Sequence, residues 1–330
     1  MSVKVSMAPV MGIDLGGTKV LAGVVGPDNT ILSRSKRSTP AKDGAEAILS
    51  VIVECIHEAA AAAGVAIDQL AGIGVGTPGP LDVERGVILF SSNLNVRDFA
   101  LGPDLAVATG RQVLVQNDVR VGGYGEFRLG VGKGYKNILA AFVGTGIGGC
   151  VILDGKIVTG VTGNAGELGH IIVKASGPHC GCGMRGCLEA VASRSAIARR
   201  IAKAVRKGQP SLLALKVDKK GGKLKSGDLA EAFNAHDVLA VKEVHRAARL
   251  LGIGLGSLVN VLGPELVIIG GGVAEALGEP YRALVEQAIR AHTIVDPDHK
   301  IQIQSASLGD DAGLLGSALM AREHFAKKRI

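Results

Sequence analysis

A glycine-rich turn that follows an apolar strand occurs twice in this sequence. Gly16-Gly17 lies between the strand-like residues 11–13 and 20–25, and the run 144–149 lies between residues 138–143 and 150–153. Apolar runs separated by glycines predict antiparallel strands joined by tight turns. Because both turns occupy the same place relative to their strands, we predict a duplicated α/β domain.

Apolar periodicity predicts further strands and helices around these turns. A third antiparallel strand is expected at residues 31–34, and residues 45–63, which lack proline and glycine, predict an amphipathic helix. Farther along we predict a buried strand at 73–75, helices from about residue 188 and at 238–261, a strand at 266–269, and a last helix at 312–325 that could pack on either half of the chain.

The length of the chain predicts two lobes. At 330 residues the chain exceeds the size at which a single hydrophobic core usually stops growing. We place the first lobe at residues 1–127, joined by the last helix at 312–330, and the second lobe at residues 128–311.

Composition and charge argue against several classes of partner. The net charge is +7, but aromatic residues that could stack on bases make up only 3% of the chain, so we expect no nucleic-acid partner. We interpret the lysine-rich segment 216–225 and the basic run 327–329 as exposed. The first ten residues are too short and polar for a signal peptide, and every apolar run ends before it could span a bilayer. We therefore expect a cytoplasmic protein with no membrane partner.

The residues Asp14-Leu15-Gly16-Gly17-Thr18-Lys19 form the first candidate phosphate-binding turn. Glycines without a β-carbon let backbone N–H groups approach phosphate oxygens, Thr18 offers a hydroxyl, and Asp14 can hold hydrated Mg²⁺. A plain hairpin turn explains the glycine pair equally well. The spacing fits neither the P-loop nor the dinucleotide pattern.

Two later glycine runs add to this candidate. Thr145 and Gly146 lie in a second run that could bind phosphate in the same way, opposite the first. Gly271 and Gly272 follow a buried strand, where a flat purine could lie against the backbone, although a tight strand-to-helix turn explains them nearly as well.

A cluster of cysteines predicts a metal site. Cys180, Cys182 and Cys187 lie within eight residues, and His170 and His179 are the nearby histidines. Three thiolates and one imidazole complete a tetrahedral set for structural zinc with no open position for water. The alternative is three free buried thiols. His179 adjoins Cys180 directly and would be strained as a ligand to the same ion.

These motifs resemble the two phosphate motifs and the adenosine motif of the actin, sugar kinase and heat-shock ATPase superfamily. Within it, the string from Gly166 to Glu189 is similar to the signature of the ROK family of repressors, open-reading-frame proteins and kinases. The resemblance runs from Met11 to the final helix. It implies a two-lobed actin-like ATPase (ribonuclease H-like) fold, His170 as the zinc histidine of the second lobe, and Mg²⁺ bound with ATP.

The resemblance also implies the site residues. Asp118 matches the catalytic base of ROK sugar kinases, although an Asn-Asp pair before a helix is more often a cap. Capping would explain Asn117 and Asp118 without any catalysis. The residues matched to hexose binding are Gly79, Asn93, Asn117, Asp118, Glu167, His170 and Glu189. Those matched to ATP are Asp14, Gly16, Gly17, Thr18, Lys19, Thr145, Gly146, Gly271 and Gly272.

One departure from the family pattern concerns the acceptor. Many glucose-phosphorylating members have a tryptophan shortly after the residues that match Asn93-Leu94, and this chain has none. Glucose is the leading hexose, with fructose, mannose, allose and N-acetylmannosamine as rivals and polyphosphate as a rival donor. Some ROK relatives are sugar-binding repressors, but only about a dozen residues precede Asp14, too few for their DNA-binding motif. We expect a homodimer or a higher homo-oligomer.

Overall fold

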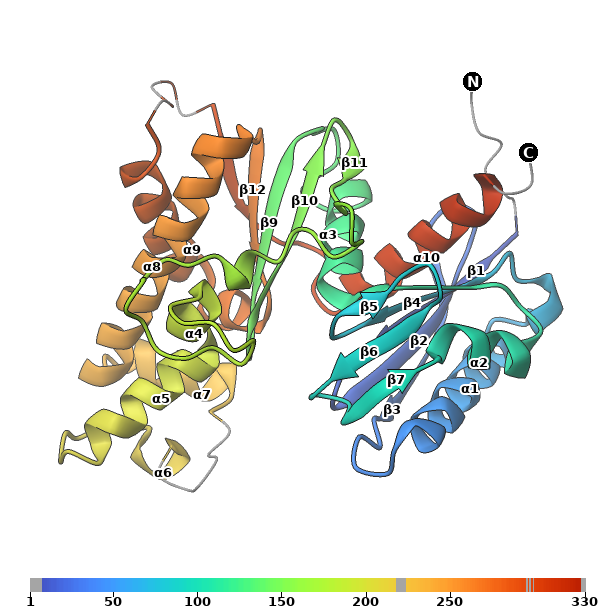
Figure 1. The fold of residues 1–330 in the computed structure, drawn as a ribbon, viewed down its shortest axis with the longest axis horizontal. Helices are drawn as coiled ribbons and strands as arrows, with labels where there is room; N and C mark the ends of the chain where they lie inside the picture. The colour runs from blue at the N-terminus through green and yellow to red at the C-terminus, as the bar shows by residue number, and fades with distance from the viewer. Residues whose placement is uncertain (1–7, 218–223, 295, 297, 299, 328–330) are drawn as a thin grey trace. The chain divides into compact units, whose positions relative to one another are not determined.

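The computed structural model describes residues 8–217, 224–294, 296, 298 and 300–327. The chain divides into two compact units (Figure 1). The first comprises Met1–Lys133, Thr159–Ala165 and Asp310–Ile330, and the second comprises Gly134–Val158 and Gly166–Gly309. No helix within the described ranges is long and apolar enough to cross a membrane. Most of the lysine-rich segment, at 218–223, and the basic residues 328–329 lie outside the described residues.

The first unit is built on a five-stranded mixed sheet with the order β3-β2-β1-β4-β8. The central strand β1 is antiparallel to β2 and parallel to β4, which is parallel to β8. The strands are β1 (Val10–Leu15), β2 (Lys19–Val25), β3 (Ile31–Ser38), β4 (Ile73–Thr77) and β8 (Val113–Asn117). The first turn, Gly16 to Thr18, therefore joins two paired strands, as predicted.

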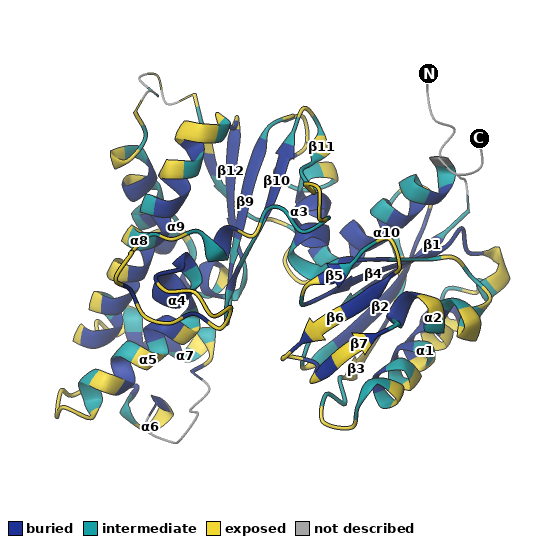
Figure 2. Cartoon of the chain, viewed as in Figure 1, coloured by how far each residue is buried: buried dark blue, intermediate teal, exposed yellow. Residues whose placement is uncertain are grey.

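The remaining elements of this unit are helices that pack on the sheet and a separate small sheet, and the strands of the main sheet are largely buried (Figure 2). Helix α1 buries Ile48, Ile52 and Ile56, which recur every four residues and so lie on one face. The small sheet β5-β6-β7 is not anticipated by the periodicity. The elements are α1 (Ala45–Ala62), η1 (Ile67–Gln69), β5 (Leu81–Asp82), β6 (Val87–Ser91), β7 (Val96–Phe99), α2 (Leu101–Thr109), α3 (Asp118–Arg128) and α10 (Asp311–Lys327).

Glycines let the last helix, α10, approach the sheet and α3 at backbone distance. A β-carbon on Gly12 of β1 would lie 2.1 Å from the carbonyl oxygen of Leu314, and one on Gly74 of β4 would lie 2.0 Å from that of Ser317. Ser317 also accepts a hydrogen bond from the backbone N–H of Ile13 at 3.1 Å. Helix α10 is thus part of the first unit's interior, which answers the packing question that the sequence leaves open.

The second unit repeats the architecture of the first. Its sheet has the order β11-β10-β9-β12-β13, with β9 antiparallel to β10 and parallel to β12. Strand direction and order therefore match the first sheet position by position, which confirms the predicted duplication. The strands are β9 (Ile138–Val143), β10 (Ile147–Leu153), β11 (Lys156–Ile157), β12 (Leu266–Gly270) and β13 (Gln302–Ser305).

The second turn is shorter than predicted. Strand β10 begins at Ile147 and pairs with Val143, so Gly148 and Gly149 belong to the strand and not to the turn. Gly149 pairs with Ala141 of β9, and a β-carbon on it would lie 2.1 Å from the side chain of Leu168. The glycine is needed for a close contact, and no turn is required at that position.

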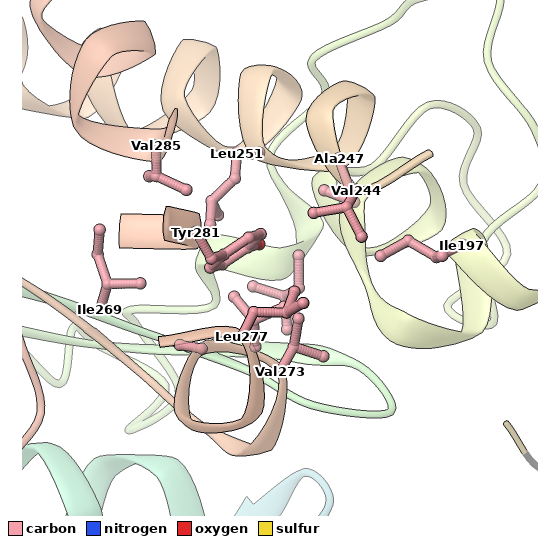
Figure 3. Packing of buried hydrophobic residues seen from close by; sticks show 14 of the residues in the cluster. Ile197, Val244, Ala247, Leu251, Ile269, Val273, Leu277, Tyr281 and Val285 are labelled. Atoms are coloured by element: carbon pink, nitrogen blue, oxygen red, sulfur yellow. The ribbon is translucent and has the colours of Figure 1, made fainter. Parts of the chain in front are cut away.

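Two long helices supply much of the second unit's core (Figure 3). Leu251 of α8 and Leu277 and Val285 of α9 surround Tyr281, which is completely buried. Burial raises the pKa of the Tyr281 phenol well above its ordinary value. The helical elements are η2 (Leu168–His170), α4 (Leu188–Ala192), α5 (Arg194–Val205), α6 (Ala214–Val217), α7 (Ser226–Asn234), α8 (Val238–Leu262) and α9 (Gly272–Ala291).

Candidate active site

The candidate residues form two groups, one in each unit. In the first unit the carboxyl ends of three parallel neighbours, β1, β4 and β8, come together. Asp14 pairs in register with Gly76, and Thr77 pairs with Asn117. A β-carbon on Gly76 would lie 3.5 Å from the Cα of Asp118. Asp14 and Asp118 therefore flank the end of one strand, the edge at which parallel α/β sheets bind ligands.

Asn117 and Asp118 begin helix α3, and both side chains contact backbone at the helix start. The Oδ1 of Asn117 accepts from the Arg120 N–H at 3.0 Å, so Asn117 is the N-cap. The Oδ1 of Asp118 accepts from the Val119 N–H at 2.8 Å. The capping alternative is correct for Asn117. The cap uses only the side-chain oxygen of Asn117, so its amide NH₂ can donate to a substrate hydroxyl.

The hydroxyl of Thr77 is a buried polar group at the same edge. Its Oγ1 has no hydrogen-bond partner within the part of the chain that the structure describes. A buried hydroxyl without a partner costs free energy, and a ligand or an ordered water at this edge would remove that cost.

Arg120 anchors the segment 159–165 to this unit. Its guanidinium donates to the carbonyl oxygens of Gly163 at 2.7 Å and Ala165 at 3.0 Å, and to the side chain of Gln116 at 3.0 Å. The side chain of Asn164 bonds to both backbone groups of Leu81. No motif in the sequence points to Arg120, which lies two residues after Asp118.

Burial and two neighbouring charges shift the pKa of Asp14, which lies at the first turn. Burial raises the pKa of Asp14 above its ordinary value, Lys19 opposes that effect, and Asp310 adds to it. The Nζ of Lys19 lies 2.9 Å from a carboxylate oxygen of Asp310, and Lys19 lowers the pKa of Asp310. A carboxylate whose ionised form is disfavoured at a sheet edge fits a site that a divalent cation completes, and Asp14 could supply one oxygen ligand for such a cation.

Two glycines at this edge are held close to neighbouring backbone. A β-carbon on Gly17 would lie 2.7 Å from the carbonyl oxygen of Asn93, so the first turn lies directly beside Asn93. Gly79 has a φ of 113° and its β-carbon would lie 2.3 Å from the carbonyl oxygen of Phe90. Any side chain at Gly79 would separate the loop after β4 from β6.

In the second unit the second turn is bonded to the start of α5. The backbone N–H of Arg194 donates to the Gly144 carbonyl at 3.0 Å, and its guanidinium donates to the Thr145 hydroxyl at 2.6 Å. The Ser195 hydroxyl donates to the Thr145 carbonyl at 2.7 Å. Sequence reasoning does not single out Arg194 or Ser195, although Ser193 before a helical run is a recognisable N-cap signal.

The third glycine run is a strand-to-helix turn, as one of the two alternatives predicts. Gly271 is the N-cap of α9 with a φ of 84°, and a β-carbon there would lie 2.7 Å from the backbone N of Val143. This turn therefore lies against the end of β9, directly before the second turn. Gly272 begins α9.

Four side chains in the second unit fit a structural zinc ion. Donor atoms of His170, Cys180, Cys182 and Cys187 all lie within 4.8 Å of one another. The sulfurs of Cys182 and Cys187 are 3.7 Å apart, close to the ~3.8 Å edge expected for a tetrahedron with Zn–S bonds of about 2.3 Å. His179 is not in the cluster; it forms a β-bridge with Arg185.

The two ring nitrogens of His170 face different directions. Its Nδ1 faces the Cys180 sulfur at 3.7 Å, which leaves Nε2 to face another partner. Gly169 before it lies against β10, since a β-carbon would lie 2.0 Å from the Ile147 carbonyl oxygen. Glu167, which precedes η2, is exposed.

Glu189 connects the cysteine cluster to the second turn. Its Oε2 accepts from the Ile147 N–H at 2.9 Å, and its Oε1 lies 3.9 Å from the Cys180 sulfur. A β-carbon on Gly146 would lie 2.2 Å from the same carboxylate. The absence of a side chain at Gly146 therefore leaves room for the carboxylate of Glu189 in this position.

Comparison with known proteins identifies the family of the chain. Residues 10–324 match the ROK family. The glucokinase of Halalkalibacterium halodurans is 34% identical over 314 residues, covering 95% of this chain and 94% of the relative. The ROK hexokinase of Thermus thermophilus superposes with a TM-score of 0.82 at 38% identity, covering 97% and 99% of the two chains. A ROK family glucokinase from Streptomyces griseus, solved with glucose and AMPPNP, gives a TM-score of 0.80 at 34% identity, covering 96% and 99%.

The chain belongs to the ROK family. With that membership goes the actin-like ATPase fold, whose repeated mixed sheets are those of the two units.

Proposed function

We propose that this protein transfers the γ-phosphate of ATP to a hexose, with glucose as the leading acceptor and its 6-hydroxyl as the attacking group. The observation that carries the proposal is that Asp14 and Asp118 both lie at the carboxyl ends of the neighbouring strands β1, β4 and β8. One carboxylate can hold the metal of a nucleotide and the other can accept a proton, which are the two parts that phosphoryl transfer to an alcohol requires.

Asp118 is the proposed general base. It accepts the proton of the sugar hydroxyl as that oxygen attacks the γ-phosphorus in line with the leaving group. It lies in the first turn of α3, and a helix N-terminus attracts negative charge. The hydrogen bond to the Val119 N–H fixes the other face of the carboxylate.

The hexose is proposed to bind Gly79, Asn93, Asn117, Asp118, Glu167, His170 and Glu189. Asn117 can donate through its amide NH₂ because its oxygen is engaged in the cap. His170 can donate through Nε2 because Nδ1 faces the cysteines. Glu189 can accept through lone pairs that its bond to Ile147 leaves available. A site built from such groups rejects sugars that lack a matching hydroxyl.

ATP is proposed to bind the glycine runs at Asp14 to Lys19, Thr145-Gly146 and Gly271-Gly272. Mg²⁺ bound with ATP would neutralise charge that develops on the transferred phosphoryl group. Asp14 would hold it, and burial of that carboxylate supports a cation there. Zinc would be structural, held by His170, Cys180, Cys182 and Cys187, and it would fix the ring direction of His170.

The similarity to enzymes described as glucokinase and hexokinase supports a kinase. The second candidate is a sugar-sensing protein that binds a hexose without phosphorylating it, since repressors also occur in the ROK family. Asp118 at the helix start favours the kinase, because sensing alone has no need of a base at the acceptor hydroxyl.

A coupled assay of ADP formation with a panel of hexoses tests the proposal. We expect turnover with ATP and the highest kcat/KM for glucose, with fructose, mannose, allose and N-acetylmannosamine as comparison acceptors and polyphosphate as the comparison donor. Binding of glucose without turnover of any hexose would favour the sensor. A cytoplasmic location and a homo-oligomeric state stay predictions.

A further inference from the structure

The positively charged guanidinium of Arg194 lies at the second turn. It is the first residue of α5, and its backbone N–H is already bonded to the Gly144 carbonyl at 3.0 Å. Its guanidinium Nη2 donates to the Thr145 hydroxyl at 2.6 Å. The backbone N–H of Arg194 is therefore occupied, and α5 presents two side chains at this turn, the Arg194 guanidinium and the Ser195 hydroxyl.

The other end of the guanidinium reaches toward the third glycine run. Its Nη1 donates to the Ser226 hydroxyl at 2.9 Å. Ser226 begins α7 and lies beside Gly272, where a β-carbon would be 3.4 Å from the serine Oγ. The guanidinium of Arg194 thus lies between the second turn and the start of α9, all within the second unit.

The charge of Arg194 has no anionic partner in this arrangement. Both groups that accept from the guanidinium are neutral hydroxyls, and across residues 8–217, 224–294 and 300–327 no carboxylate forms an ion pair with it. The side chain is half-buried, and burial lowers the pKa of its guanidinium. A partly desolvated cation without a counter-ion is costly, and an anionic ligand would remove that cost.

We propose that Arg194 binds a phosphate group of the nucleotide at the second turn. This inference rests on the proposed function, because it requires a nucleotide at Thr145 and Gly146. The guanidinium is planar and has five N–H donors, so it can keep its hydroxyl partners and still donate to phosphate oxygens. Arg194 is a binding residue that holds the donor; the proton transfer stays with Asp118.

The competing explanation is a purely structural clamp between Thr145 and Ser226. The two explanations differ in what is lost when the charge is removed. A phosphate contact discriminates ligands with phosphates from ligands without them. A clamp that only shapes the pocket would affect the nucleoside and the nucleotide alike.

Isothermal titration of ADP and adenosine against Arg194→Gln separates these explanations. We expect ADP to bind about 10- to 100-fold more weakly, which corresponds to the loss of one charge-assisted hydrogen-bonding group, with adenosine affinity within about twofold of the unchanged protein. Arg194→Lys keeps the charge without the fork and should lose less. Arg199→Gln is the matched control, because Arg199 lies on the same helix, is exposed and donates to the Ala190 carbonyl.

The outcomes are distinct. Unchanged ADP affinity, or equal losses for ADP and adenosine, would overturn the phosphate contact. If the unchanged protein binds ADP but phosphorylates no hexose, the proposed function fails and the Arg194 contact stands or falls on the titration. If the unchanged protein binds neither ADP nor ATP, both are overturned.

Discussion

Replacing Gly316 by alanine would add one methyl group between two helices of the first unit. Gly316 lies inside α10, and a β-carbon there would lie 1.7 Å from the Val121 carbonyl oxygen and 3.0 Å from the Gly125 N of α3. Ordinary contacts between such atoms are about 3.5 Å or more, so the two helices would have to separate by more than about 1 Å. Both obstructing atoms are backbone, which no rotamer change can move.

The expected loss of stability is the strain less the gain in helix propensity. Overpacking in a well-packed interior costs about 1–3 kcal/mol, and a clash with backbone falls at the upper end. Alanine in a helix interior is favoured over glycine by about 1 kcal/mol. The net loss is therefore about 2 kcal/mol, and in a unit of about 160 residues this lowers Tm by about 4–8 °C.

Gly227→Ala is the matched control for this experiment. Gly227 also lies in a helix, α7, but it is exposed and a β-carbon there meets no atom within 4 Å. We expect the control to leave stability unchanged or to raise it by about 0.4–1 kcal/mol. Thermal unfolding followed by circular dichroism, with urea midpoints as a second measure, gives both values.

The reasoning also makes a kinetic prediction, because Val121 is one helical turn after Asp118. A shift of α3 should lower kcat in Gly316→Ala at 25 °C, where the protein is still folded. If Gly316→Ala proves as stable as Gly227→Ala, the close packing of α10 on α3 is wrong. If Gly316→Ala loses stability but keeps its kcat, the packing of α10 on α3 does not control the position of Asp118.

Three further predictions concern the candidate site. Asp118→Asn should lower kcat about 100-fold or more with hexose affinity within a few fold, measured by the coupled assay and by titration with glucose. Asp14→Asn should lose turnover yet unfold at higher urea at pH 7. Because burial raises the folded-state pKa of Asp14 above 3.8, the ionised carboxylate destabilises the fold above that raised pKa and the penalty disappears below 3.8, so the difference between the proteins should vanish at acid pH. Cys182→Ser should lower the zinc content determined by metal analysis and weaken glucose binding through His170.

Each of these has an outcome that contradicts it. Normal turnover by Asp118→Asn would remove it as the base. An Asp14→Asn protein less stable than the unchanged protein at neutral pH would mean that Lys19 outweighs burial at that carboxylate. Full zinc content in Cys182→Ser would refute the ligand set, for which Cys55→Ser, away from the cluster, is the control.

Local sequence signals predicted the repeated elements well. The helix expected at 45–63 is α1, and the helix expected at 238–261 is α8, because unbroken 3.6-residue periodicity is the strongest such signal. The glycine runs and the cysteine cluster are contiguous in sequence, so their local geometry could be predicted from spacing. The predicted extent of the second turn was wrong because the sequence does not distinguish a glycine that permits close packing, such as Gly149, from a glycine that permits a turn.

Contacts between distant segments could not be predicted in the same way. No sequence signal near Lys19 predicts its ion pair with Asp310. No signal near Asp118 predicts that Arg120 bonds to the segment 159–165. Arg194 lies 49 residues from the hydroxyl that it bonds. Such pairs depend on how sheets and helices pack, and a charged residue in a helix is most often merely exposed. The small sheet β5-β7 was missed because its strands are short and one of them has only two residues.

The place of α10 in the chain has a consequence for how the protein is synthesised. About 180 residues separate Lys133 from Asp310, and at about 5–20 residues per second a ribosome needs about 10–40 s to make them. Throughout that interval the glycine-lined surface of β1 and β4 has no helix to cover it, while the second unit can already form. The first unit, although synthesised first, is completed last, so its uncovered sheet is the surface that a chaperone would have to protect.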